Sequence, residues 1–234
     1  MIKKAKLIPR DLEQLKYWIR SWEDLTNVDV SGLDSLEWAF QDVPYYHGSI
    51  KDWNTKNVKD LSFCFCWAEN FNEDISKWNV GKVERMKCLF AWAKSFNKPL
   101  NNWDTKNVKD MSFCFYEAKN FNKPLNKWNT RNVQDMAQMF SKAEAFNQNI
   151  NDWDVRNVER MNYMFAWAKS FNKPLNKWEF KKIRDISCMF LKAIAFNQNL
   201  NAWDFWKFKT SKEWFKEVFK LSWMQEKNYP KIKS

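Results

Sequence analysis

Glycine and histidine are scarce in this chain: its 234 residues include three glycines and one histidine. So few glycines exclude a glycine-rich phosphate-binding loop, and turns must rely on Asn, Asp and Lys-Pro pairs instead. A single histidine, without a serine-centred nucleophile motif, leaves none of the usual catalytic constellations. We therefore predict a protein that is not an enzyme, with no catalytic residues and no cofactor.

Long apolar runs are also absent. No run approaches the length of a membrane-spanning helix, so no transmembrane segment is predicted. Residues 1–8, MIKKAKLI, contain no apolar stretch typical of a secretion signal. The sequence by itself therefore predicts a cytoplasmic location.

The five cysteines form no recognisable framework, because their number is odd and no C-x-x-C motif occurs. Cys64 and Cys114 lie two repeats apart, which at ~4.8 Å per repeat gives about 10 Å, beyond disulfide reach. We interpret the cysteines as small buried hydrophobic residues. An acidic column that includes Asp104 and Asp154 is interrupted by asparagines, so no metal site is predicted.

What the chain does have is a repeat of 25 residues. Seven tryptophans keep this spacing: Trp53, Trp78, Trp103, Trp128, Trp153, Trp178 and Trp203. Two phenylalanine columns and one alanine column share the period, for example Phe90 with Phe115, Phe96 with Phe121, and Ala93 with Ala118. A fixed period of this size indicates stacked coils that bury their apolar faces against one another.

The repeat divides the chain into three predicted parts. Residues 1–27 form an N-terminal cap helix, residues 28–205 the repeat solenoid, and residues 206–234 a C-terminal cap helix and tail. The two cap helices are predicted from amphipathic patterns that would cover the open ends of the stack. The C-terminal pattern follows a Thr210–Glu213 capping box.

Within one coil the pattern predicts a short helix and a short strand. In residues 107–118, NVKDMSFCFYEA, helical spacing relates Val108, Met111, Phe115 and Ala118. Asn107 is a favoured helix N-cap, and Asp110 follows at the capping-box position. Residues 99–105, PLNNWDT, predict a short strand. The predicted class is thus an α/β solenoid of about seven 25-residue coils, each with a helix and a parallel strand.

An asparagine follows each phenylalanine of one column. These residues are Asn72, Asn97, Asn122, Asn147, Asn172 and Asn197. We expect them to point inward and to form a ladder of hydrogen bonds from coil to coil. His47 holds the equivalent position in the first coil and is interpreted as a substitute for asparagine.

A formal net charge of +11 and a pI near 9.3 favour acidic partners. Two columns of lysines could form a basic stripe beside the predicted strands, and we take this stripe as the candidate binding site: Lys77, Lys98, Lys123, Lys127, Lys173 and Lys177. The predicted function is a non-enzymatic interaction module that binds a protein or another acidic macromolecule along an extended surface.

The alternative function is binding of single-stranded RNA through the same basic stripe. Modular RNA readers stack bases on aromatic side chains at repeat spacing. Trp67, Trp92 and Trp167 are the aromatic residues that the core columns do not need.

The repeat unit, with WDTKNVKDM at residues 103–111 and FNKPLNNW at 96–103, closely resembles that of BspA-like leucine-rich-repeat proteins. These are bacterial surface proteins and lipoproteins with a 25-residue repeat of unknown function. The resemblance covers residues 28–205 and implies a leucine-rich-repeat-like α/β solenoid. It also implies an adhesion-type role at the cell surface and no catalytic residue.

Overall fold

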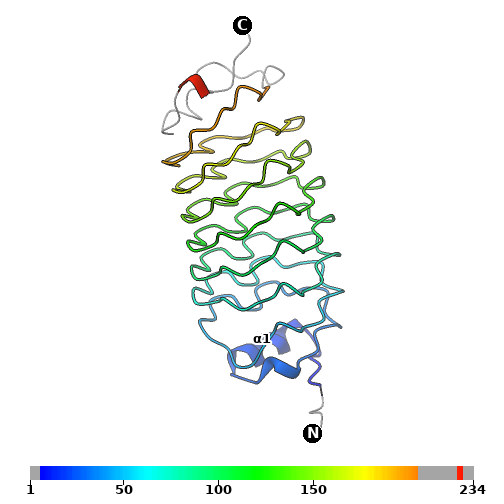
Figure 1. Ribbon diagram of the computed structural model, residues 1–234. Coiled ribbons are helices and arrows are strands. Elements are labelled where there is room, and N and C mark those ends of the chain that lie inside the picture. Colours follow the sequence, from blue (N-terminus) through cyan, green and yellow to red (C-terminus); the bar gives the residue numbers. More distant parts are fainter. Residues whose placement is uncertain (1–5, 205–225, 229–234) are drawn as a thin grey trace.

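A computed structural model describes residues 6–204 and 226–228 of the chain. The described residues form one elongated stack of coils, which climbs from helix α1 (Leu12–Arg20) at one end to residue 204 near the other (Figure 1). Short 3-10 turns lie at Leu25–Asn27 (η1) and Glu226–Asn228 (η2).

One parallel backbone bridge fixes the register between each pair of coils. At the N-terminal end Leu7 bridges to Val28, and from there on the bridges join residues 25 positions apart: Ser35 to Asp60, Asp60 to Arg85, Arg85 to Asp110, Asp110 to Asp135, Asp135 to Arg160, and Arg160 to Asp185. Equivalent residues of successive coils therefore lie side by side. The 25-residue spacing in the sequence is the length of one coil.

The predicted α/β class, with a leucine-rich-repeat-like helix and strand in each coil, is wrong. In residues 6–204 and 226–228, α1 is the sole α-helix and the parallel contacts are isolated bridges rather than strands. The coils consist of consecutive turns and irregular segments. Their stability must come from contacts between coils.

The hydrogen bonds of residues 111–117 show why no helix forms. Alternate amides close tight turns: the N–H of Cys114 donates to the Met111 carbonyl at 3.2 Å. The amides between them reach the next coil, as when the Phe113 N–H donates to Ala137 at 2.8 Å. A helix would need every N–H to bond four residues back. Apolar residues spaced by three and four therefore bury themselves here without helical hydrogen bonding.

The predicted capping residues have other partners. The Asn107 side chain donates from Nδ2 to the Gly81 carbonyl of the preceding coil at 2.6 Å. The Asp110 carboxylate accepts from the Ser112 N–H at 2.8 Å and so closes a local turn. Both residues serve turns and coil-to-coil contacts instead of a helix N-terminus.

Left-handed backbone angles recur twice in each coil. Fifteen non-glycine residues of the described part have positive φ, and all but Trp22 belong to two columns: Trp38, Phe63, Cys88, Phe113, Gln138, Tyr163 and Cys188 in one, and Asp42, Trp67, Trp92, Glu117, Lys142, Trp167 and Lys192 in the other. Such a conformation costs about 1–2 kcal/mol for a residue other than glycine. The inter-coil hydrogen bonds that it permits must offset this cost.

The aromatic columns form the core. Trp103 and Trp128 lie parallel with ring centroids 6.4 Å apart, and Phe90 and Phe115 are 5.5 Å apart. The Trp128 indole N–H donates to the Leu100 carbonyl at 2.9 Å, and each tryptophan of this column makes the equivalent bond. The repeated tryptophans thus fill the interior and bind one coil to the next.

The asparagine ladder is confirmed. The backbone N–H of Asn97 donates to the Oδ1 atom of Asn72 at 3.0 Å, and the pattern continues to Asn197. The expectation that these side chains point inward is wrong, because they lie at or near the surface. The ladder begins at Asn72. His47 instead accepts through its backbone carbonyl from the Leu25 N–H at 3.0 Å.

The two ends of the stack differ. At the first end the Asp11 carboxylate caps α1 by accepting from the Gln14 N–H at 2.8 Å, and α1 buries Leu15 and Ile19. At the other end Asn228 donates from Nδ2 to the Asn197 Oδ1 atom at 2.8 Å, which extends the asparagine ladder. The predicted C-terminal helix lies outside the described residues, apart from 226–228.

Candidate functional site

The six predicted lysines do not form one uniform stripe. Lys77 pairs with Asp52 at 3.2 Å and Lys177 pairs with Asp152 at 2.6 Å, so these two charges are partly balanced. The three lysines next to prolines are half-buried: Lys98, Lys123 and Lys173. Lys127 is exposed, and no carboxylate of the described chain lies within ion-pair distance of it.

A second row of cations, which we name the basic row, lies four residues after the column of Lys127 and Lys177 in each coil. It consists of Lys106, Arg131, Arg156 and Lys181, which are exposed and hold equivalent positions in four successive coils. Lys106 pairs with Asp104 at 2.8 Å and Arg156 with Asp154 at 2.6 Å. Arg131 and Lys181 have no ion pair within the described residues. The sequence prediction overlooked this row, although its unbroken 25-residue spacing was a sufficient signal.

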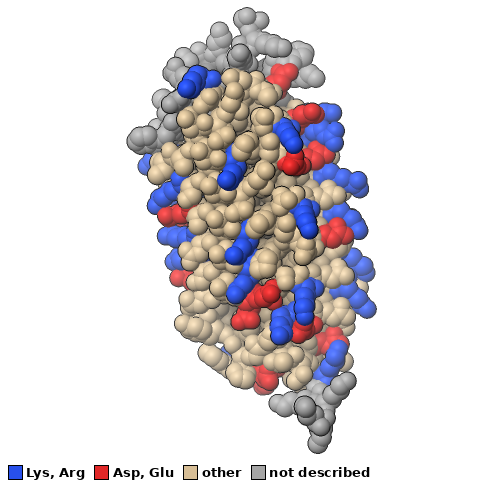
Figure 2. Space-filling view, in the orientation of Figure 1, with Lys and Arg blue, Asp and Glu red and all other residues tan. Residues whose placement is uncertain are grey.

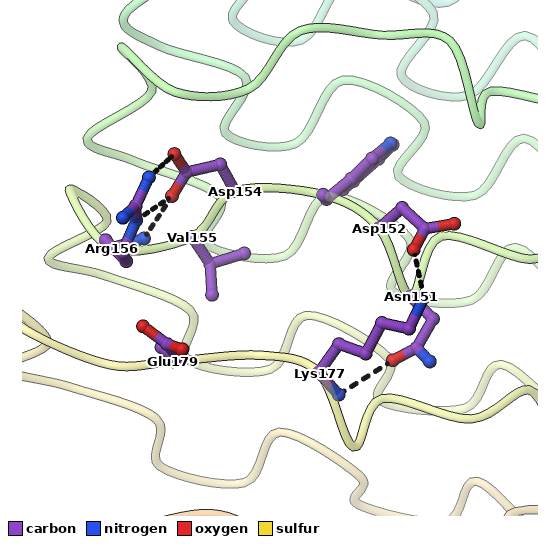
Figure 3. Close-up of a pocket in the computed structure, with 8 residues that line it drawn as sticks. Asn151, Asp152, Asp154, Val155, Arg156, Lys177 and Glu179 are labelled. Atoms are coloured by element: carbon purple, nitrogen blue, oxygen red, sulfur yellow. Dashed lines mark hydrogen bonds and ion pairs between the residues drawn. The ribbon is translucent and has the colours of Figure 1, made fainter.

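A shallow hollow of about 250 Å³ lies between Arg156 of the basic row and Lys177. Figure 3 shows its two sides: Arg156 turns toward Asp154 on one, and Lys177 toward Asp152 on the other. The residues that line the hollow are Asn151, Asp152, Trp153, Asp154, Val155, Arg156, Lys177 and Glu179. The Trp153 ring is 3% exposed and belongs to the core beneath. The hollow therefore offers polar and charged groups without an open aromatic face.

Arg156 and Asp154 form a two-point contact at the edge of this hollow. Arg156 donates from Nε to Oδ1 at 2.9 Å and from Nη2 to Oδ2 at 2.6 Å. These bonds lower the pKa of Asp154, and Lys181 adds a smaller electrostatic effect in the same direction. Both charges of the pair are accordingly held, which orients the guanidinium group along the surface.

Elsewhere on the stack, many acidic side chains are matched by cations exactly one coil away. Asp135 binds Arg160 at 2.6 Å, and Asp60 binds Arg85 at 2.9 Å. Further pairs one coil apart are Glu69–Lys94, Glu84–Lys109, Glu117–Lys142 and Glu144–Lys169. Figure 2 shows the resulting mixture of blue and red side chains along the two edges of one face. These pairs favour correct coil register. In the basic row, Lys106 and Arg156 pair within their own coils, and only Arg131 and Lys181 have no ion pair among the described residues.

The three aromatic residues that the core did not need lie on another segment of the coil. Trp67 is 42% exposed and stacks on Trp92 with ring centroids 4.0 Å apart. Trp92 in turn meets the edge of Tyr116 at 4.8 Å. Trp167 is partly buried. None of the three lines the hollow beside the basic row.

The described residues offer little for metal or thiol chemistry. In residues 6–204 and 226–228, no three His, Cys, Asp or Glu side chains gather in a way that could hold a metal ion. All five cysteines are free, and burial raises the pKa of the Cys66 and Cys88 thiols to about 12. Among the same residues, no helix has the length and apolar character needed to cross a membrane.

Stacked coils with continuous side-chain columns define a repeat protein. A family model described as "Mycoplasma protein of unknown function, DUF285" matches residues 12–128 and again residues 110–227. The chain therefore belongs to this family, and the two overlapping matches reflect its internal repetition. No curated protein matches the chain.

Proposed function

We propose that the chain is a non-enzymatic binding module that holds an acidic segment of a partner protein against the basic row and the adjacent Lys127. The observation that carries the proposal is the succession of Lys106, Arg131, Arg156 and Lys181, each exposed and each one coil from the next. Arg131 and Lys181 lack a partner carboxylate among the described residues, so they are available to an external one.

The spacing of the row suits an extended ligand. Equivalent residues of adjacent coils that share a parallel bridge are ~4.8 Å apart, so the row spans several carboxylates of an extended acidic chain. A single exposed ion pair contributes only about 0–1 kcal/mol. Binding must therefore use several coils at once, and its rate should fall as salt screens the charges.

RNA is the weaker candidate for this face. Proteins that bind single strands combine basic grooves with aromatic faces on which bases stack. Beside the basic row, the indole rings of Trp128, Trp153 and Trp178 are 2–3% exposed and their N–H groups are bonded to backbone carbonyls. The exposed Trp67 lies on a different segment of the coil.

The resemblance of the repeat to BspA-like surface proteins supports an adhesion-type setting for this contact. We propose on that ground that the partner is an acidic protein met at a cell surface. Antibody labelling of intact cells, compared with labelling of permeabilised cells, tests the setting separately from the binding itself.

The binding test compares two double variants that remove equal charge. In Arg131→Gln/Lys181→Gln the basic row loses its two unpaired cations. In Lys94→Gln/Lys169→Gln two cations are lost that pair with Glu69 and Glu144. We expect the first variant to bind a fluorescent poly-glutamate peptide about ten-fold more weakly at 0.15 M salt, and the second to bind like the wild type.

Two outcomes would contradict the proposal. Equal weakening by both double variants would mean that net charge alone attracts the peptide. Tighter binding of a single-stranded RNA oligonucleotide than of the peptide, lost in the first variant, would assign the row to nucleic acid. Thermal unfolding of both variants checks that the stack is intact.

A further inference from the structure

One surface column changes its chemistry from coil to coil, unlike the core columns. It begins with the exposed Asp42, continues with Trp67 and Trp92, and then becomes charged at Glu117 and Lys142. Core columns keep one residue type because every coil needs the same packing. A column that varies outside the core is free to carry a local binding function.

Trp67 presents one open ring face in this column. Its other face is covered by Trp92, at 4.0 Å between ring centroids and 8° between ring planes. The Asp42 N–H donates to the Cys66 carbonyl at 2.9 Å, which places Asp42 directly beside Trp67 in the preceding coil. The translation that puts Trp92 on one face of Trp67 therefore puts Asp42 on the other. A short carboxylate covers little of an indole, and Trp67 remains 42% exposed.

Within the described residues, the Asp42 carboxylate has no ion pair and no side-chain hydrogen bond. The nearby Asp60 and Glu69 each form an ion pair. Burial, followed by the charge of Asp42, raises the pKa of the Cys66 thiol to about 12. The carboxylate charge thus acts on the residue that adjoins Trp67. An open indole face and an unpaired carboxylate stand together at this point of the surface.

We propose that Trp67 and Asp42 form a binding site for a quaternary ammonium group. A cation is attracted to the face of an aromatic ring, most strongly to tryptophan. The carboxylate supplies the opposite charge at the edge of the same face. A trimethylammonium group also brings apolar surface to the indole, whereas a primary ammonium is compact and strongly hydrated.

The chain contains its own control position. Trp167 has the same place in its coil as Trp67, and both have positive φ, 57° and 64°. The residue before Trp167 in the column is Lys142, which pairs with Glu117 at 2.6 Å and lies 5.2 Å from the Tyr116 ring. A fixed cation therefore stands where Trp67 has a carboxylate. Trp167 should not bind a second cation.

The test measures binding of tetramethylammonium chloride and phosphocholine by indole ¹⁵N–¹H NMR, with the Trp67 signal assigned from a Trp67→Phe variant. We expect the Trp67 signal to shift in a saturable way. Asp42→Asn, followed by the Trp67 signal, and Trp67→Leu, followed by the indole signal of Trp92 that stacks at this position, should each weaken binding about ten-fold, in line with loss of the charge partner or of the cation–π contact. Trp67→Phe should retain part of the affinity, and Trp167→Leu should leave it unchanged.

A neutral analogue separates charge recognition from apolar contact. 3,3-Dimethylbutan-1-ol has the shape of choline without its charge, and we expect no saturable shift with it. Equal binding of this alcohol, equal loss in Trp167→Leu, or no response to tetramethylammonium would overturn the proposal. Phosphatidylcholine vesicles and a trimethyl-lysine peptide then identify the source, and saturable binding of either supports the site. The basic row is not involved, so the two proposals fail independently.

Discussion

The backbone N–H of Asn147 donates to the Oδ1 atom of Asn122 at 3.0 Å, across the boundary between two coils. The same oxygen accepts from the Gln148 Nε2 atom at 2.8 Å. One carboxamide thus satisfies two groups of the following coil. Repeated along the stack, this contact connects exposed corners that the aromatic core does not reach.

Asn122→Ala should lower the free energy of unfolding by about 1 kcal/mol, the usual net contribution of such hydrogen bonds. The Asn147 N–H would lose its acceptor, and water can replace it only in part. Urea denaturation measures the change. Asn120→Ala is the control, because Asn120 is exposed and bonds the Lys94 carbonyl through its backbone N–H, which the substitution keeps. Equal effects of the two substitutions would refute a role for the ladder.

The Trp128 indole N–H is part of the interior, not of the surface. Trp128→Phe should cost about 2–3 kcal/mol, because it removes buried volume and the indole N–H bond to the Leu100 carbonyl at 2.9 Å, which then accepts from the Trp103 N–H alone. Thermal unfolding followed by circular dichroism gives the change. Trp22→Phe should have little effect, since Trp22 is 63% exposed. A Trp128→Phe protein as stable as the wild type would show that this bond contributes nothing.

Gln138 tests the left-handed column. Its φ is 56°, a conformation that β-branched residues adopt with difficulty. Gln138→Val should therefore destabilise the protein by about 1–2 kcal/mol more than Gln134→Val, since Gln134 is exposed and does not have positive φ. Urea denaturation curves of the two variants measure this difference in the free energy of unfolding. No difference between them would mean that residue 138 is not left-handed in solution.

Asp29 should make the stability of the first coil depend on pH. The Ser31 hydroxyl and N–H, and the Lys6 ammonium, lower the pKa of Asp29 from 3.8 to about 2. A carboxyl whose pKa is lower in the folded state stabilises the protein above pH 4 and loses this contribution as the pH falls toward 2. The stability difference between wild type and Asp29→Asn should therefore shrink over that range. A difference that stays constant from pH 5 to pH 2 would contradict the assignment.

Much of the stack could be predicted from the sequence, because like residues must meet like when coils lie in register. The Trp53 and Phe65 columns and the Asn72 ladder follow from this rule alone. The prediction of a helix over residues 107–118 was wrong, because consecutive turns can bury apolar residues that have the same spacing. The left-handed backbone conformations could not be predicted, because glycine usually occupies such positions and here they hold residues such as Phe113 and Glu117.

The candidate site, too, could be predicted from the sequence only in part. Lysines could be assigned to columns from their spacing, but the sequence did not show that Lys77 and Lys177 pair with Asp52 and Asp152. Such pairing depends on which residue of the neighbouring coil stands within reach. The basic row that contains Arg131 was not predicted, because the predicted stripe was placed beside strands that the coils do not form.

The most direct test of the stacked-coil account is a distance series by pulsed electron spin resonance. Spin labels at residue 31 and at residue 131, 156 or 181 occupy equivalent positions four, five and six coils apart. At ~4.8 Å per coil the backbone separations should rise in even steps, from about 19 Å to about 29 Å. Equal or irregular distances in the three pairs would contradict the stack.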